Sequence, residues 1–164
     1  MNKSKLAVTN LHEGKIAKLA KKTDNKTLAT WALDCAECVL PYFESKYPED
    51  DRPRVAIETG RDWVKTGVFR MAVIRKAALD SHSAAREVKD DDVARSVARA
   101  AGQAVATAHV PTHALAAAVY ATTAIRDATH PANADAATTK EREWQYQHLK
   151  KLGNLTLLLA YASG

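Results

Sequence analysis

Apolar residues recur along this chain at steps of three and four, the spacing of one face of an α-helix. The clearest stripe joins Leu28, Trp31, Cys35, Cys38 and Tyr42. No strand-like alternation persists, and valine and isoleucine occur mostly singly. The pattern therefore predicts an all-α fold, a single compact helical bundle of about six or seven helices.

Breaker and capping residues divide the pattern into elements. Pro41 cannot donate a hydrogen bond to the Glu37 carbonyl, so a kink or an early end is expected there. The aspartates at positions 90–92 supply an N-cap, and Pro111 marks a boundary because it biases Val110 away from helical angles. The expected helices cover residues 11–22, 28–47, 48–67, 69–89, 93–109, 112–128 and 138–153.

The last helix is expected to follow a loop at residues 129–137. Thr138 and Glu141 form a capping-box pattern at its start, and Gly153 can end it. Residues 153–164 then form a short C-terminal tail that must dock its leucines on another surface.

Length and composition favour one ordered domain over residues 1–164. Apolar residues make up 46% of the chain, and the many alanines at helix positions predict close helix packing and an alanine-rich core. The first fifteen residues lack the apolar segment of a signal peptide, and no run approaches the ~18 apolar residues of a membrane span. We therefore expect a cytoplasmic protein with no membrane partner.

The charge is basic but dispersed. The formal net charge is +5, and the densest lysine run, residues 15–26, has no interleaved aromatic residues. It is more typical of a solvated helix face than of a nucleic-acid patch, which is kept as the weaker alternative. Arg52 and Arg54 could bind a carboxylate or phosphate on a partner, although acids at positions 49–51 can neutralise them.

The cysteines and histidines could be read as a metal site. Cys35 and Cys38 lie two turns inside a helix and not at its N-terminus, which favours buried, inert thiols over a redox pair. His109 and His113 are four residues apart, but about seventy residues separate them from Cys38, no glutamate follows His109, and Pro111 disturbs their helical spacing. We therefore expect no metal or other cofactor; if a metal binds, His109 and His113 are its ligands.

Three histidines lie on or beside small-residue faces of expected helices, and each buried imidazole needs a polar partner. Asp34 is the first acid to consider. The sequence thus predicts a polar centre of Asp34, His82, His109 and His113, with structural contacts as its first interpretation and a ligand pocket as its second.

Four segments together resemble small bacterial immunity proteins of toxin systems over about residues 28–149. They are "WALDCAECVLPYFESKYPEDDRPRVAIETGRDWV", "RKAALDSHSAARE", "ARAAGQAVATAHVPTHALAAAVYA" and "EREWQYQHL". The resemblance implies an all-α fold and a role in binding and neutralising a toxin from a competing or sibling cell. Positions that match the family's recurring polar residues are Asp34, Arg52, Arg54, Arg61, His82, His109, His113 and Glu141.

The leading hypothesis is therefore a non-enzymatic immunity protein without a catalytic residue. Its partner is a protein toxin, contacted through Arg52, Arg54 and Arg61. The alternative is a metal- or ligand-dependent helical enzyme that uses the histidine centre. Nucleic-acid binding is the weaker alternative, and a homo-oligomer is also left open.

Overall fold

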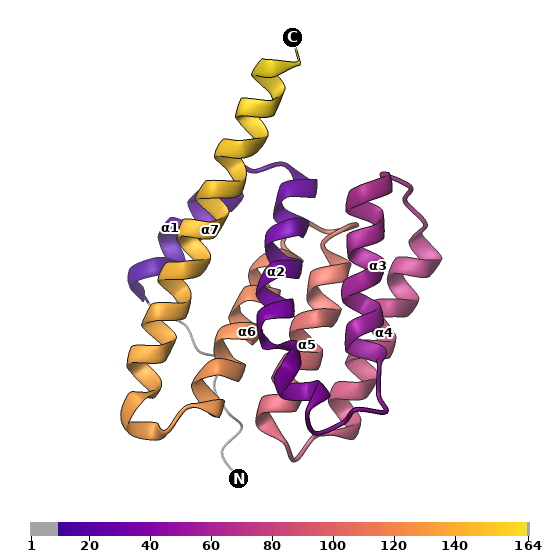
Figure 1. Cartoon of the computed structure of the whole chain (residues 1–164), viewed down its shortest axis with the longest axis vertical. Helices are drawn as coiled ribbons and strands as arrows, with labels where there is room; N and C mark the ends of the chain where they lie inside the picture. The colour runs from indigo at the N-terminus through magenta and orange to yellow at the C-terminus, as the bar shows by residue number, and fades with distance from the viewer. Residues whose placement is uncertain (1–9, 164) are drawn as a thin grey trace.

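The computed structural model describes residues 10–163, with side chains from residue 13 onward. Within this part of the chain there are seven α-helices, one short 3-10 helix and no strand, so the all-α prediction is confirmed (Figure 1). The helices are α1 (Asn10–Ala20), α2 (Asn25–Glu44), α3 (Arg52–Thr66), α4 (Met71–Glu87), α5 (Asp92–Ala106), α6 (His113–Ala128) and α7 (Ala134–Ala162), with the 3-10 helix η1 at Pro131–Asn133. Residues 1–9, which contribute to the expectation about a signal peptide, lie outside the described residues.

Helix α5 occupies the centre of the bundle. It packs against α2, α3, α4 and α6, while α7 lies at one edge against α1, α2 and α6 (Figure 1). On α5, Ala94, Ala98 and Ala101 are fully buried, and the largest buried apolar side chains, Trp31 and Phe43, come from α2. Small residues on the central helix let neighbouring helix axes approach closely, as the alanine content predicted.

Several predicted boundaries are correct to within a few residues. Asp24 caps α2 by accepting a hydrogen bond from the Thr27 backbone amide at 3.0 Å. Asp91 caps α5 in the same way through Ala94. Gly67 ends α3 with a φ of 70°, a left-handed angle that costs glycine little.

Pro41 does not end α2 early. The helix continues to Glu44, and Pro41 lies exposed within its last turn. One lost backbone hydrogen bond at this position is tolerated because buried neighbours such as Leu40 and Phe43 hold the turn against the core.

The predicted limits of the last helix are wrong at both ends. Helix α7 begins at Ala134, inside the expected loop, and Thr138 is an interior residue whose hydroxyl donates to the Ala134 carbonyl at 2.8 Å. Gly153 also lies inside the helix, which runs on to Ala162. A single glycine costs a helix only about 1 kcal/mol relative to alanine, and the leucines that follow are strong helix formers.

The C-terminal leucines were expected to dock on the molecule, but in the structure they are exposed. The last turns of α7 project beyond the bundle, and Leu157, Leu158 and Leu159 are between 61% and 70% exposed (Figure 1). In the described part of the chain, no helix combines the length and the apolar character needed to cross a membrane.

Candidate functional site

A polar cluster at the surface joins three helices around Asp34. The Asp34 carboxylate of α2 accepts from Arg61 of α3 at 2.7 Å and lies 2.6 Å from Nε2 of His148 on α7. Arg61 also pairs with Glu37, one turn after Asp34 on α2. The indole of Trp144 stacks on the His148 ring, with centroids 5.0 Å apart and planes 13° from parallel. We call Asp34, Glu37, Arg61, Trp144 and His148 the Asp34 cluster.

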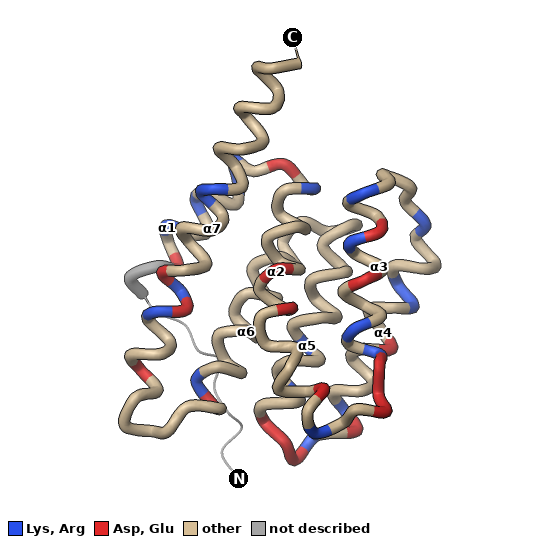
Figure 2. The backbone as a smooth tube through the Cα atoms, in the orientation of Figure 1, with Lys and Arg blue, Asp and Glu red and all other residues tan. Residues whose placement is uncertain are grey.

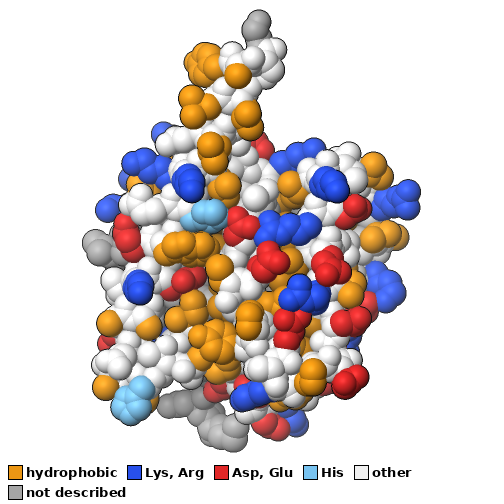
Figure 3. Space-filling view, viewed as in Figure 1, with side chains coloured by type: hydrophobic (Ala, Val, Ile, Leu, Met, Phe, Trp, Pro, Cys, Tyr) orange, Lys and Arg blue, Asp and Glu red, His pale blue; other side chains and the backbone are white. Residues whose placement is uncertain are grey.

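Helical spacing brings these residues to one face. Asp34 and Glu37 are three residues apart, and Trp144 and His148 are four apart, so each pair shares a side of its helix. The acidic and basic side chains and a histidine gather beside apolar side chains on the face of the molecule seen in Figure 3. Trp144 is 37% exposed and the Arg61 side chain 35% exposed, so both are accessible from solvent.

A close helix contact places Arg61 beside Asp34. A Cβ at the neighbouring Gly60 would lie 2.6 Å from Cδ2 of Leu33. Only glycine therefore allows α3 to approach α2 at this level without displacing that leucine. Arg61 follows Gly60 on α3 and Asp34 follows Leu33 on α2, so this close contact brings the two residues together as an ion pair.

A buried polar network fixes α7 beneath the cluster. The Trp31 indole donates to the Gln145 carbonyl at 2.8 Å. The two N–H groups of the Gln145 side-chain amide are shared among three acceptors, the Ala118 carbonyl at 3.0 Å, the Thr122 hydroxyl at 3.1 Å and the Glu141 carboxylate at 2.9 Å. Gln145 is fully buried, so these partners satisfy a group that would be costly to bury alone.

Arg142 extends this network to α1. Its side chain is 1% exposed, donates to Oε1 of Gln145 at 2.6 Å and pairs with Glu13. The nearby Glu141 has a pKa raised by burial, against the opposing effects of its Gln145 hydrogen bond and of Arg142. These polar residues lie between helices and hold α7 in place, so the positions of Trp144 and His148 at the surface of α7 are fixed.

The electrostatics of the Asp34 cluster favour fixed charges. Burial alone would lower the pKa of Arg61, but its hydrogen bonds to Glu37 and Asp34 outweigh this and raise it. Arg61 is therefore a permanent cation between two carboxylates, and its guanidinium geometry is set by both.

The two cysteines lie at different depths. Cys35 is fully buried, as expected, whereas Cys38 is exposed, which corrects the prediction of two buried thiols. Although Cys38 is exposed overall, partial burial raises its pKa, and the nearby Glu141 and Asp34 raise it further. The pKa of Cys35 is raised well above its usual range, mainly by burial. Both groups are protonated thiols at neutral pH, which makes them poor nucleophiles.

The three predicted histidines lie near one another at the junction of α4, α5 and α6. The His109 and His113 rings are 5.6 Å apart, and Nδ1 of His113 lies 2.6 Å from Oε1 of Gln103. His82 fits against Gly102, where a Cβ would come within 2.7 Å of its ring. Nδ1 of His82 and Nδ1 of His109 are buried without a hydrogen-bond partner.

Burial lowers the pKa of His82 to about 4, with further contributions from Arg99, Arg86 and His113. Burial and the neighbouring His109 also lower the pKa of His113. These two imidazoles are therefore neutral at pH 7. Among the described residues, no group of three or more His, Cys, Asp or Glu side chains is arranged to hold a metal ion.

Asp34 does not share the histidine centre predicted from the sequence. Its carboxylate is engaged by Arg61 and by His148, a histidine that the sequence reasoning did not select. Trp144 and Glu37 were also missed. The sequence signal for Trp144 and His148 was their i, i+4 spacing, which places an aromatic and a polar side chain on the same side of one helix. No comparable signal marked Glu37.

The other two predicted arginines are engaged elsewhere. Arg52 pairs with Asp50 at 2.7 Å and with Glu87 at 2.6 Å, which raises its pKa. Arg54 pairs with Glu44 at 2.5 Å. Asp50 thus neutralises Arg52, as the acids at positions 49–51 were expected to do. Of the three predicted arginines, Arg61 lies in the Asp34 cluster.

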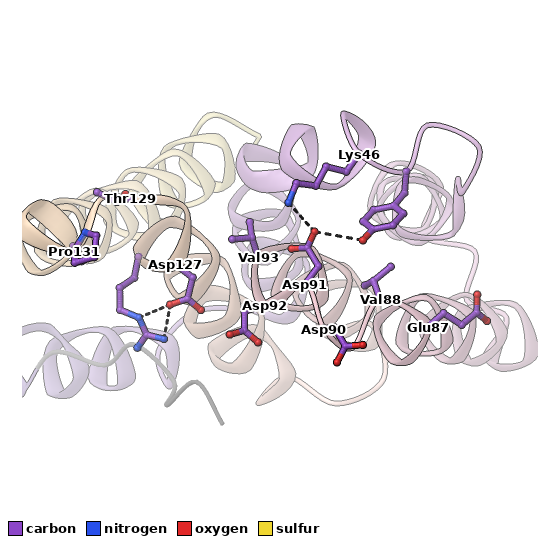
Figure 4. Close-up of a pocket in the computed structure, with 13 residues that line it drawn as sticks. Lys46, Glu87, Val88, Asp90, Asp91, Asp92, Val93, Asp127, Thr129 and Pro131 are labelled. Atoms are coloured by element: carbon purple, nitrogen blue, oxygen red, sulfur yellow. Dashed lines mark hydrogen bonds and ion pairs between the residues drawn. The ribbon is translucent and has the colours of Figure 1, made fainter. Parts of the chain in front are cut away.

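A hollow of about 840 Å³ lies at the end of the bundle where the α4–α5 turn meets α6 and η1 (Figure 4). Its acidic residue Asp91 accepts from Lys46 at 2.9 Å and from the Tyr47 hydroxyl at 3.4 Å while capping α5. Asp127 pairs with Arg126 at 2.8 Å on the opposite wall. The Asp91 contacts connect the segment after α2 to the start of α5, whereas the Asp127–Arg126 pair lies within the end of α6.

Comparison with known proteins gives one match. A model of the family described as "Imm-5 like putative immunity protein" matches residues 18–152, which include the whole Asp34 cluster and the three histidines. No curated protein and no solved structure matches the chain.

Proposed function

The chain belongs to this Imm-5 like immunity family, and on that premise we propose that it is a non-enzymatic cytoplasmic protein that binds and neutralises a protein toxin. The Asp34 cluster is the centre of the toxin-binding surface. The proposal depends on one observation above all: the Asp34 carboxylate of α2 holds the half-buried Arg61 of α3 and His148 of α7, on which the exposed Trp144 stacks.

The composition of the cluster suits a protein interface. Tryptophan and arginine are over-represented among residues that dominate binding energy, especially where they are held in one conformation. Trp144 is stacked on His148, and Arg61 is held by Asp34 and Glu37, so little side-chain freedom remains to be lost on binding.

The charge of the cluster suggests the chemistry of the toxin surface. Asp34 and Glu37 carry two negative charges against the one of Arg61, and Glu37 is 47% exposed. A basic side chain of the toxin beside Glu37, with an apolar contact on Trp144, would complement this surface.

Co-expression with a toxin whose gene adjoins this one tests the proposal. Cells that produce both proteins should survive, and the two should form a complex. Trp144→Ala and Arg61→Ala should each weaken the complex at least about tenfold, as expected for residues at the centre of an interface.

Arg54→Ala is the matched control, since it removes an arginine of the same helix whose partner, Glu44, lies outside the cluster. Circular dichroism melting establishes that each variant is folded. Loss of protection by the cluster variants alone supports the proposal. Unchanged affinity in both cluster variants, or no complex with the wild-type chain, overturns it.

The histidines support a second candidate function, ligand or metal binding at the α4–α5–α6 junction. The observation in its favour is the pair of buried Nδ1 atoms without partners, on His82 and His109. Elemental analysis after incubation with Zn²⁺ or Ni²⁺ tests it. Less than about a tenth of an equivalent of metal, with no rise in melting temperature, excludes a metal of useful affinity.

A further inference from the structure

The projecting end of α7 is apolar on more than one side. Leu155 and Leu159 lie one turn apart, whereas Leu157 and Tyr161 lie on the opposite side of the helix. These four side chains are 45%, 70%, 61% and 87% exposed. No charged residue occurs after Lys151. We call residues 155–162 the leucine tip; Figure 3 shows its apolar side chains standing clear of the bundle.

A groove or a second helix would cover one side of the tip and leave the other in water. An apolar surface that surrounds a helix end is better matched by a medium that can close around it, such as the interfacial region of a lipid bilayer. The tip is too short to cross a bilayer, so the fitting mode is shallow insertion from one side.

A group of lysines surrounds the base of the tip. Helix α1 and the turn after it run beside α7, because Lys15 lies over the Tyr146 ring and the Thr27 hydroxyl is 2.9 Å from that of Thr156. Lys21 and Lys22 lie between these two contacts, and Lys150 and Lys151 lie on α7 one turn before the tip.

All four lysines are exposed, and within the described part of the chain none of them forms an ion pair. We call Lys21, Lys22, Lys150 and Lys151 the lysine collar. The acid in the adjoining turn, Asp24, is occupied in capping α2 through Thr27.

A run of three acidic residues lies at the other end of the molecule. The aspartates at positions 90–92, in the turn between α4 and α5, lie at the end of the bundle opposite the leucine tip (Figure 2). Lys46 and Arg95 pair with Asp91 and Asp92 at that end. An anionic surface would therefore attract the collar end more strongly than the far end, which orients the tip toward the surface.

From these observations we propose that the leucine tip and the lysine collar form a peripheral docking site for an anionic phospholipid bilayer. The tip inserts among the lipids at headgroup level, and the collar contacts the phosphates. The leucine tip lies beyond the family-matched residues 18–152, whereas the collar lysines lie within them, and neither includes a residue of the Asp34 cluster. It revises the expectation of no membrane partner, which considered spanning segments only.

Flotation of the full chain with vesicles tests the proposal. One set of vesicles contains phosphatidylcholine alone, and the other contains phosphatidylcholine mixed with phosphatidylglycerol. The wild-type chain should bind the mixed vesicles at least about tenfold more tightly, and added salt should weaken that binding. No binding to the mixed vesicles overturns the proposal.

Two double variants separate the contributions of the site. Leu158→Asn with Leu159→Asn should reduce binding to the mixed vesicles at least about tenfold by removing apolar contact. Lys150→Gln with Lys151→Gln should reduce it by a similar factor and weaken the preference for anionic lipid, because Lys21 and Lys22 remain. Leu79→Asn and Lys89→Gln, exposed residues on other parts of the bundle, should change nothing. Unchanged binding by either double variant overturns the proposal.

Sedimentation velocity without lipid tests the alternative that a second copy of the chain packs on the leucine tip. A wild-type dimer that the leucine double variant converts to monomer, with no vesicle binding by either, assigns the tip to a second copy of the chain and overturns the lipid proposal. Toxin protection by the leucine double variant should remain at wild-type level. Failure of the lipid proposal is thereby distinguishable from failure of the proposed immunity function.

Discussion

The Asp34 carboxylate lies 2.6 Å from Nε2 of His148, a residue 114 positions away in the chain. The same carboxylate accepts from Arg61 at 2.7 Å, so one side chain of α2 connects both α3 and α7. This shared contact makes Asp34 a positioning residue for the half-buried Arg61 and for Trp144 stacked on His148.

Replacing Asp34 should destabilise the protein. Asp34→Asn removes the charge that both partners contact, and each hydrogen bond to a charged group contributes about 1.5–3 kcal/mol before solvent exposure is taken into account. The Asp34 side chain is 24% exposed, so we expect a combined loss of about 1–2 kcal/mol in the free energy of unfolding. Urea denaturation measures it. Asp62→Asn, on the exposed face of α3, is the control and should stay within about 0.5 kcal/mol of wild type.

Helical periodicity explains which parts of this arrangement were predictable. Steps of three and four identify helices and their buried faces, and Asp24, Gly67 and Pro111 mark ends through local backbone chemistry. Which faces meet depends on packing between distant helices. Asp34 and Arg61 were recognised as polar positions, but their shared partner His148 lies on a helix whose position a single sequence does not give.

The limits of α7 were missed for a different reason. A capping box and a glycine are statistical signals of a helix end, and each contributes only a small free energy toward ending the helix there. Alanines before Thr138 and leucines after Gly153 continue the helix at less cost than ending it. Arg142 and Gln145 were missed because polar residues in a charged stretch suggest a solvated face, whereas here they bond each other in the interior.

The contact of Gly60 with Leu33 should make α3 intolerant of a larger residue at this position. Gly60→Ala places a methyl group 2.6 Å from Cδ2 of the fully buried Leu33. Overpacking costs about 1–3 kcal/mol and alanine returns about 1 kcal/mol of helix propensity, so we expect a net loss of about 0–2 kcal/mol in stability. Gly14→Ala, inside α1 with no atom within 4 Å of the added Cβ, should instead be neutral or slightly stabilising. Chemical denaturation of both variants checks the pair. Equal effects would show that α2 and α3 are not in close contact here.

The pH dependence of stability should reveal the neutral His82. Its pKa is lowered from 6.5 to about 4 in the folded state, so the unfolded chain binds more protons between these values. The stability that His82 contributes is therefore complete above pH 6.5 and is lost as the pH falls toward 4. Because the ring is partly exposed, we expect a loss of about 1–2 kcal/mol over this range.

Urea denaturation of wild type and His82→Asn at several pH values measures this contribution. The variant should be less sensitive to pH between 4 and 6.5, the range set by the His82 pKa. His130→Asn, at an exposed position in the turn after α6, should keep the wild-type profile. Parallel profiles for wild type and His82→Asn would contradict a buried neutral imidazole.

Gly153 and Gly67 make opposite predictions for the same substitution. Gly153 lies in the helical interior of α7 with no atom within 4 Å of an added Cβ, so Gly153→Ala should stabilise the helix by about 0.5–1 kcal/mol. Gly67 has a φ of 70°, and Gly67→Ala should cost about 1 kcal/mol because a side chain strains that angle. Circular dichroism melting compares the two. A destabilising Gly153→Ala would mean that α7 ends at Gly153. The leucine tip would then not be helical, and its apolar side chains would not surround a helix end.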